Sequence, residues 1–357
     1  MSHGLTSWKM LVAVTIMAAS CNNGPTSVEI TDASGTSMPS GEIEESPGSI
    51  ACLSETIAAP KFLMAFNACP VGDCGPQDHT IHLAGSDNGS EWTLLPALGS
   101  DHGGSVPDIV RYKGELFLFH ARGNTDHVWD RLDDCLQVVE QGHVTMVGGD
   151  EGDEGWVDPS WVDDDDDLVL FYLPGIPGAN PAACTAGEDS CERSIRSART
   201  DVASFPVFTV IPGDRVRSRV GKPPNELGSF SDPDILYMND GTFLLNVSSG
   251  ENTLVYTGTE LDGAFTPPTP DGSLLWASKR RGGVPTAIQE MNSLDVWLYV
   301  HGHNQDGGWE IRRAVSDGKT ELTSQAFETV MDPSIFGSEN SGNVQGVLSP
   351  SIIYWNP

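Results

Sequence analysis

A short apolar segment built around a proline recurs five times along this chain. The five segments are SVPDIV, VDPSWV, SDPDIL, GVPTAI and LSPSII, and their prolines are Pro107, Pro159, Pro233, Pro285 and Pro350. Consecutive prolines are 52, 74, 52 and 65 residues apart. Repeats of this length are typical of architectures in which one small unit of about four strands is used several times. The repeat therefore predicts a set of similar small sheets.

The first four copies are each followed by a polar turn and a second apolar strand. The second strands are ELFLFHA, LVLFYL, TFLLNV and DVWLYVHG. Each pair predicts a β-hairpin whose first strand begins with proline, where the missing N–H is tolerated. A second repeat, a strand that runs into an Asp/Gly turn, is predicted at residues 80–92, 194–205, 254–265 and 310–322.

The fifth copy lies at the end of the chain and has only its first strand. Residues 60–98 contain strands with no proline segment before them. Pairing these two parts would complete a fifth unit and remove exposed sheet edges. Because the chain also has 39 glycines, 24 prolines and few helical patterns, we predict an all-β fold. The predicted fold is a five-bladed β-propeller over residues 55–357, closed by pairing of its N- and C-terminal strands.

The N-terminus has the zones of an export signal: Lys9, an apolar run at 10–19, and then Ser20 and Cys21. The apolar run is too short to span a bilayer. The segment at 18–21 resembles the lipobox of bacterial lipoproteins, which implies lipidation of Cys21 at the end of a signal over residues 1–21. Residues 22–54 are rich in Ser, Thr, Gly, Pro and Glu and predict a disordered tether. We expect an exported, lipid-anchored protein of the bacterial cell envelope or cell surface.

The net charge excludes some classes of binding partner, and the cysteine content predicts disulfides. The chain has 19 basic and 50 acidic residues, a net charge of −31, which repels nucleic acids and anionic membranes. We therefore expect membrane contact only through the lipid anchor, and a monomer. An even number of further cysteines in an exported chain predicts disulfides. They are Cys52, Cys69, Cys74, Cys135, Cys184 and Cys191, with Cys69–Cys74 and Cys184–Cys191 as close pairs that would staple loops.

The loops that enter the first strands should meet the ends of the second strands at one mouth of the central channel, the default position for a site. Acidic residues of this mouth include Asp101, Asp158, Glu226 and Asp232. The mouth also receives Trp156, His120, Arg122, Arg280 and Arg281. The acidic run at 163–167 lies in a hairpin turn at the opposite end of the strands. We expect this run to be solvated, and calcium is the one ion it would suit. No metal ligand set or other cofactor is expected, because nucleotide, flavin and haem motifs are missing.

The stretch VDPSWVDDDDDLVLFYL is similar to the second-blade hairpin of family 43 glycoside hydrolases, the arabinanases and xylosidases. That family uses a general-base Asp in blade one, an Asp that orients the acid in blade two, and a general-acid Glu in blade three. Asp158 matches the blade-two Asp. Val106 stands where the base is expected, and Ser231-Asp232-Pro233 stands where the family has Glu two residues before proline.

The resemblance implies a glycosidase that acts on a polysaccharide or oligosaccharide through carboxylate acid/base chemistry. Asp158 would be catalytic, with Asp108 or Asp101 as base and Asp232 or Glu226 as acid. Inverting hydrolysis requires two carboxyl groups about 6.5–9.5 Å apart with a water between them. The mouth residues Trp156, His120, Arg122, Arg280 and Arg281 would contact the carbohydrate, although a tryptophan of a propeller such as Trp156 more often packs between blades.

Three alternatives remain open. Asp or Ser beside a strand-initial proline often caps a turn, so the residues after the prolines are also interpreted as structural. They are Asp108, Ser160, Asp234, Thr286 and Ser351. The departures from the family pattern favour a propeller that binds a glycan or a protein without hydrolysis. Finally, Asp87, Gly89 and Trp92 resemble the Asp-box turn of sialidases, which points to a sialidase-like enzyme. Its candidate carboxylate-binding arginines are Arg111, Arg122, Arg280 and Arg281.

Overall fold

The computed structural model describes residues 60–355 except 73, 97, 99–101, 124–125, 150–154, 176–193, 218–230, 273–274, 292 and 317–326. All described residues belong to one compact unit, Ile50–Pro357. The predicted export signal, Cys21 and the tether lie outside them. The described part is almost entirely strand and loop, which confirms the all-β prediction. Its helices are three short 3-10 turns, none long and apolar enough to cross a membrane.

Each proline segment begins or lies within a strand. These first strands are β4 (Ser105–Tyr112), β9 (Val157–Asp164), β13 (Ser231–Tyr237), β17 (Gly283–Gln289) and β21 (Val344–Tyr354). The first four pair antiparallel with second strands, so the four predicted hairpins are confirmed. The second strands are β5 (Glu115–Arg122), β10 (Asp167–Leu173), β14 (Phe243–Ser248) and β18 (Val296–His303).

Outer strands extend the hairpins into sheets. The first sheet adds β6 (Asp126–Leu132) and β7 (Val138–His143). The second adds β11 (Ser194–Asp201), β12 (Val207–Arg217) and, parallel to β12, β8 (Thr145–Val147). The third adds β15 (Thr253–Gly258) and β16 (Leu275–Ser278).

The fourth sheet combines the last hairpin with both ends of the described chain. Its strand order is β17-β18-β19-β21-β1-β2-β3, and β20 pairs with β19. The added strands are β19 (Trp309–Ser316), β20 (Glu328–Met331), β1 (Phe62–Pro70), β2 (Thr80–Ser86) and β3 (Thr93–Leu94). The 3-10 turns η1 (Pro76–Asp78), η4 (Pro333–Phe336) and η5 (Ser341–Asn343) lie in its connections. Strand β1 pairs antiparallel with β21, as the sequence predicted for the two chain ends.

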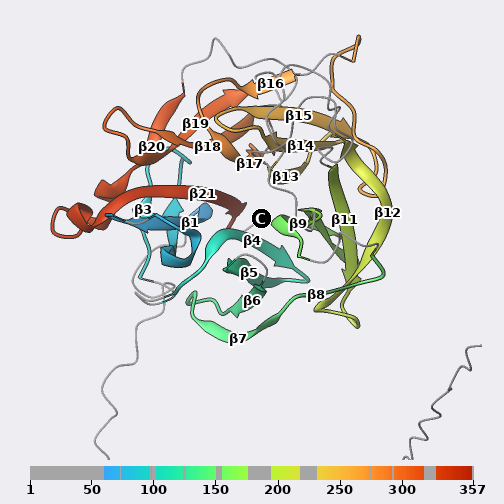
Figure 1. Ribbon diagram of the computed structural model, residues 1–357, viewed down its shortest axis with the longest axis horizontal. Coiled ribbons are helices and arrows are strands. Elements are labelled where there is room, and N and C mark those ends of the chain that lie inside the picture. The colour runs from blue at the N-terminus through green and yellow to red at the C-terminus, as the bar shows by residue number, and fades with distance from the viewer. Residues whose placement is uncertain are drawn as a thin grey trace, which may run out of the picture. The chain divides into compact units, whose positions relative to one another are not determined.

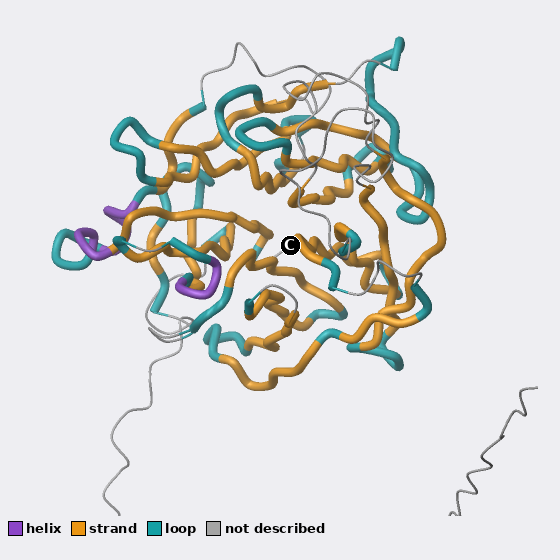
Figure 2. The backbone as a smooth tube through the Cα atoms, in the orientation of Figure 1, coloured by secondary structure: helices purple, strands orange, loops and turns teal. Residues whose placement is uncertain are grey.

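The apolar core lies between neighbouring sheets. Figures 1 and 2 show the sheets set around a common centre, and the first strands lie closest to it. Buried apolar residues form five clusters, each between two neighbouring groups of strands. Phe119 of β5, for example, stacks on Trp161 of β9 with ring centroids 4.1 Å apart. Packing between sheets therefore fixes the ends of the first strands around the centre.

Candidate active site

The residue before each of the five prolines has an unusual backbone. The φ angle is 48° at Val106, 52° at Asp158, 45° at Asp232, 45° at Val284 and 47° at Ser349. These values lie in the left-handed region, which residues before proline and β-branched residues rarely adopt. The strand pairing also changes register at this point in all five strands, so each strand has a β-bulge. A bulge re-aims nearby side chains, and here it does so at the same level of every first strand.

The five bulges surround the centre of the fold. Residues from all five proline segments line a narrow space of about 20 Å³. The residues before the prolines lie at the entry ends of the first strands, where the sequence predicts the mouth, and four of them line this constriction: Val106, Asp232, Val284 and Ser349. On the other side the residues after the prolines line a much larger cavity.

Asp158 and Asp232 are the two acidic residues among those before the prolines. Both are half-buried. Burial and, next, the negative charge of the nearby Asp158 raise the pKa of Asp232 to about 8, although a hydrogen bond with Ser231 acts to lower it. The raised pKa favours the protonated form of Asp232 beside the carboxyl group of Asp158. The structure brings together these two residues of the predicted catalytic set.

Asp108 follows its proline and lies on the other side of the constriction. Ser351 donates its hydroxyl hydrogen bond to Asp108 Oδ1, and the Trp161 N–H donates to Asp108 Oδ2 at 2.7 Å. The Ile109 N–H in turn donates to Ser351 Oγ at 3.0 Å. Burial raises the pKa of Asp108 to about 6 in spite of these hydrogen bonds. Both carboxylate oxygens of Asp108 thus connect β4 to its neighbours β9 and β21.

Asp234, for which the sequence predicts only a turn role, forms a second acidic pair with Asp108, and both side chains are half-buried like those of the first pair. Asn246 Nδ2 donates a hydrogen bond to Asp234 Oδ2 at 3.3 Å. Burial and, next, the charge of Asp108 raise the pKa of Asp234 to about 8, although hydrogen bonds with Asn246, Thr286 and Ala287 act to lower it. Only the spatial neighbourhood of Asp108 and Asp234 reveals this coupling.

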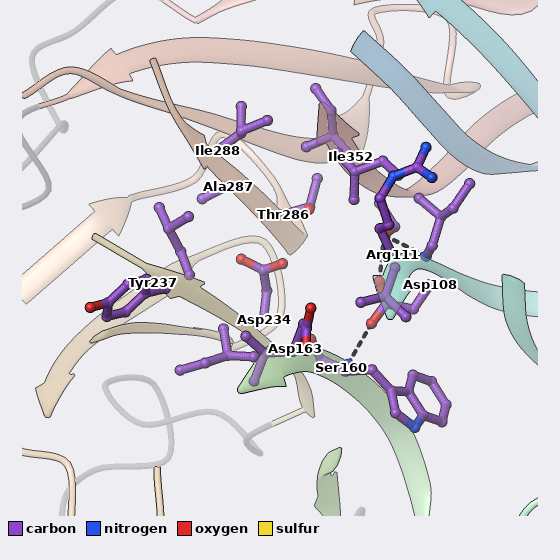
Figure 3. Close-up of a pocket in the computed structure, with 18 of the residues that line it drawn as sticks. Asp108, Arg111, Ser160, Asp163, Asp234, Tyr237, Thr286, Ala287, Ile288 and Ile352 are labelled. Carbon is purple, nitrogen blue, oxygen red and sulfur yellow. Dashed lines mark hydrogen bonds between the residues drawn. The ribbon is translucent and has the colours of Figure 1, made fainter. Parts of the chain in front are cut away.

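The cavity beside this second pair has a volume of about 520 Å³. Figure 3 shows Asp108 and Asp234 at this cavity, together with Ser160 and Thr286. Its walls further along the strands are apolar and include Ile109, Ile235, Ile288 and Ile352. The bulges therefore separate the end of the central space where Asp158 and Asp232 lie from a largely apolar cavity.

Two predicted carbohydrate contacts are packed inside the protein near the mouth. Trp156 is 6% exposed, and its ring stacks on that of His127 with centroids 3.6 Å apart. The His127 Nε2–H donates to the Trp156 carbonyl oxygen at 2.8 Å. His120 is fully buried at the end of β5, with Nε2 2.9 Å from Asp130 Oδ2. Sequence reasoning missed both His127 and Asp130, which lie in β6 without any recognisable motif.

The predicted arginines are on the surface. Arg122, Arg280 and Arg281 are exposed. The Arg281 carbonyl oxygen accepts a hydrogen bond from Arg312 Nη1 at 3.0 Å, and the Arg280 N–H donates to Asn252 Oδ1 at 3.0 Å. Glu226 and Asp101, the other acid and base candidates, lie outside the described residues.

Two further sequence features lie away from the mouth. Arg111, an arginine that a sialidase-like site could use, donates to the carbonyl oxygens of Gly114 and Trp355 and lines the large cavity. In the acidic run at 163–167, Asp166 pairs with Lys113 and Asp167 with Arg199. Calcium binding at this run stays a prediction.

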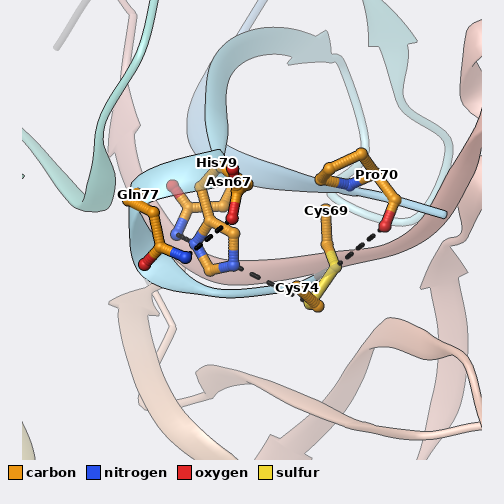
Figure 4. Close-up of a disulfide and its surroundings, with 7 residues drawn as sticks. Asn67, Cys69, Pro70, Cys74, Gln77 and His79 are labelled. Atoms are coloured by element: carbon orange, nitrogen blue, oxygen red, sulfur yellow. Dashed lines mark hydrogen bonds between the residues drawn. A yellow bond between two sulfur atoms is a disulfide. The ribbon is translucent and has the colours of Figure 1, made fainter. Parts of the chain in front are cut away.

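The predicted disulfide Cys69–Cys74 is present, and Cys135 is also disulfide-bonded. Figure 4 shows the Cys69–Cys74 bridge beside His79, whose Nε2 lies 3.8 Å from Cys74 Sγ. The bridge closes the turn between β1 and η1. Cys52, Cys184 and Cys191 lie outside the described residues.

No family model matches the chain, and no curated protein matches it in sequence. Solved structures do resemble it. A levansucrase mutant from B. megaterium has a TM-score of 0.52 at 13% identity, covering 76% of this chain and 82% of that chain. A family 43 endo-arabinanase from Bacillus licheniformis has a TM-score of 0.48 at 16% identity, covering 65% and 81%. The likeness to levansucrase shows a shared fold.

Proposed function

We propose that this chain is a glycosidase in which Asp158 and Asp232 act as a carboxylate pair at the mouth of a five-bladed β-propeller. The observation that carries the proposal is the placement of both carboxyl groups on left-handed bulges at the centre, near enough for the charge of Asp158 to raise the pKa of Asp232. The substrate would be a polysaccharide or an oligosaccharide, as expected from the family 43 resemblance.

Several contacts support the closed five-bladed form of the fold. The first strands contact one another in the circular order β4, β9, β13, β17, β21 and back to β4. The five apolar clusters lie between the same successive groups. One parallel residue pair, Trp309 with Gly346, links β19 to β21 and joins the fourth and fifth blades into a single sheet. On this interpretation β21, β1, β2 and β3 form the fifth blade.

In the proposed reaction Asp232 is the general acid and Asp158 the general base. Asp232 would donate its proton to the glycosidic oxygen as the bond from that oxygen to the anomeric carbon breaks. Asp158 would take a proton from a water whose oxygen forms the new bond to the anomeric carbon. A raised pKa suits the acid because it keeps the proton available at neutral pH. Asp108 is less suited to the role of base, since both its oxygens accept hydrogen bonds from neighbouring strands.

The test is to incubate the purified protein with a panel of pentose- and hexose-containing polysaccharides and to measure the release of reducing ends. On any substrate that the wild type cleaves, Asp158→Asn and Asp232→Asn should each lower the rate about 100-fold or more. Asp163→Asn is the matched control, because Asp163 lies on β9 with Asp158 but lines the opposite cavity. Full activity in both mouth variants would contradict the proposed roles.

A second candidate is a propeller of the same ancestry that binds a glycan or a protein without hydrolysing it. Val106 favours this candidate, because it places an apolar side chain at the bulge where the resemblance expects the base. Binding on a glycan array, together with no release of reducing ends from the same panel, would support it over the glycosidase.

We also propose that the protein is exported and held at the bacterial cell surface by a lipid on Cys21, with residues 22–54 as a tether. The disulfide between Cys69 and Cys74 supports export, since disulfides persist mainly in oxidising compartments. Labelling with a radioactive fatty acid, lost in a Cys21→Ser variant, tests the anchor.

A further inference from the structure

We propose that His102, His120 and Asp130 form a binding site for a divalent transition metal ion of the zinc type. The site is separate from the Asp158 and Asp232 pair, and the inference does not depend on the proposed glycosidase activity. Its three side chains come from the loop before β4, from the end of β5 and from the middle of β6.

The possible ligand atoms converge on one point. His102 Nε2 lies 2.8 Å and His120 Nε2 2.9 Å from the same oxygen, Asp130 Oδ2. One ligand atom from each residue lies within 4.8 Å of the other two. His120 pairs with Val128 and Leu118 with Asp130 across β5 and β6, so the register places His120 and Asp130 as diagonal neighbours.

Hydrogen bonds within the cluster leave several buried atoms without partners. His102 Nε2 is close to Asp130 but not in hydrogen-bonding geometry, and no partner is found for Asp130 Oδ1 or His120 Nδ1. Buried polar atoms normally have partners, and each exception calls for an explanation. A metal ion would use the lone pairs of the two imidazole nitrogens and of the carboxylate at once.

The backbone is arranged to keep the cluster tight. The Ile81 N–H donates to the His102 carbonyl oxygen at 2.8 Å, which fixes the loop against β2. Gly104 has φ of 159°, and a Cβ there would lie 2.3 Å from His120 Nδ1. Only a residue without a side chain lets the loop close so tightly over His120.

The donor set selects the class of ion. Two imidazole nitrogens and one carboxylate oxygen suit zinc and similar borderline metals, whereas calcium prefers oxygen ligands alone. Three protein ligands leave a fourth position for water or another ligand. The side chains of His120 and Asp130 are fully buried and that of His102 is 12% exposed, so an ion would enter past His102.

The test uses the full chain, stripped with chelator, incubated with zinc or cobalt and dialysed. We expect about one zinc per chain by mass spectrometry of the metal, and cobalt absorption bands typical of a low-coordinate site. His102→Ala should weaken zinc binding about 10-fold or more and lose the cobalt bands, with little effect on folding because His102 lies in a loop.

The matched control is His143→Ala. His143 belongs to the same sheet and also contacts an aspartate, with Nδ1 2.8 Å from Asp126 Oδ1, but it is exposed and belongs to no cluster of three possible metal ligands within the described residues. This variant should bind zinc as the wild type does. The proposal is overturned if the wild type retains no zinc after dialysis, or if His102→Ala binds zinc as tightly as the wild type. Thermal unfolding of each variant, with and without zinc, shows whether it is folded.

Discussion

The residues immediately before and immediately after the prolines contrast in environment, although a single residue separates them. Asp158 and Asp232, before their prolines, lie on left-handed bulges at the mouth. Asp108 and Asp234, after their prolines, accept hydrogen bonds from neighbouring strands beside the large cavity. A single proline therefore separates the position whose carboxyl groups are suited to catalysis from the position whose carboxyl groups connect neighbouring strands.

The contrast also explains why a raised pKa alone does not identify a catalytic acid. Asp232 and Asp234 both have a pKa of about 8, and burial is the largest cause in each. Asp234 is hydrogen-bonded to residues of β14 and β17, whereas Asp232 lies at the mouth. Position and hydrogen-bond partners, rather than the pKa, separate the two roles.

The largest effect on stability is expected at Asp108. In Asp108→Asn one carboxylate oxygen becomes an amide NH2, which must face either the Trp161 N–H or the Ser351 hydroxyl. A buried donor would then lack its acceptor, which should lower the free energy of unfolding by about 2–3 kcal/mol. Urea unfolding measures the change.

Asp158→Asn is the matched substitution on the other side of a proline. Because it removes a negative charge beside Asp232, it should cost under about 1 kcal/mol or even stabilise the protein. If Asp158→Asn destabilises the protein as much as Asp108→Asn does, the two sides of the prolines do not differ in the way proposed.

A smaller effect is expected in the pH dependence of stability. The pKa of Asp232 is raised from 3.8 to about 8 on folding, so the unfolded chain loses this proton first. The contribution of Asp232 to stability is therefore greatest below about pH 4 and decreases as pH rises to about 8. Asp232→Asn should remove this decrease and raise the free energy of unfolding at pH 8 by about 1–2 kcal/mol, since solvent reaches the half-buried side chain.

Urea unfolding of wild type and variant at pH 5 and pH 8 checks this sign. The gain should be larger at pH 8 than at pH 5, because the loss of stability caused by the raised pKa of Asp232 grows progressively from about pH 4 to about pH 8. A gain in stability combined with a loss of hydrolysis would show that Asp232 is retained for function at the expense of stability. An equal effect at both pH values would mean that Asp232 is already ionised at pH 5.

The sequence predicts much of the fold because its signals are local. A strand that begins with proline, a polar turn and a second apolar strand are adjacent in the chain, so all four hairpins could be predicted. The pairing of β1 with β21 followed from two incomplete units that complement each other. The Cys69–Cys74 bridge followed from close spacing.

The site is harder to predict because its contacts join distant segments. The residues after the prolines look alike in sequence, but hydrogen bonds to Trp161 and Ser351 give Asp108 its structural role. Similarly, no short motif joins His102, His120 and Asp130, which come together only when β5 and β6 pair and the loop before β4 closes over them. The stacking of Trp156 on His127 likewise depends on β6, which the segment around Trp156 does not reveal.

The smallest effect concerns the left-handed bulges themselves. Val284 has φ of 45°, a conformation that costs about 1–3 kcal/mol for a residue with a side chain. Val284→Gly removes this cost but loses side-chain contacts and increases the freedom of the unfolded chain. We therefore expect its free energy of unfolding to equal that of the wild type or to exceed it by up to about 1 kcal/mol.

Val157→Gly is the control, at a half-buried position just before a bulge. It should instead lower the free energy of unfolding by about 1–2 kcal/mol. Urea unfolding measures both changes. If Val284→Gly lowers the free energy of unfolding as much as Val157→Gly does, the bulges store no strain.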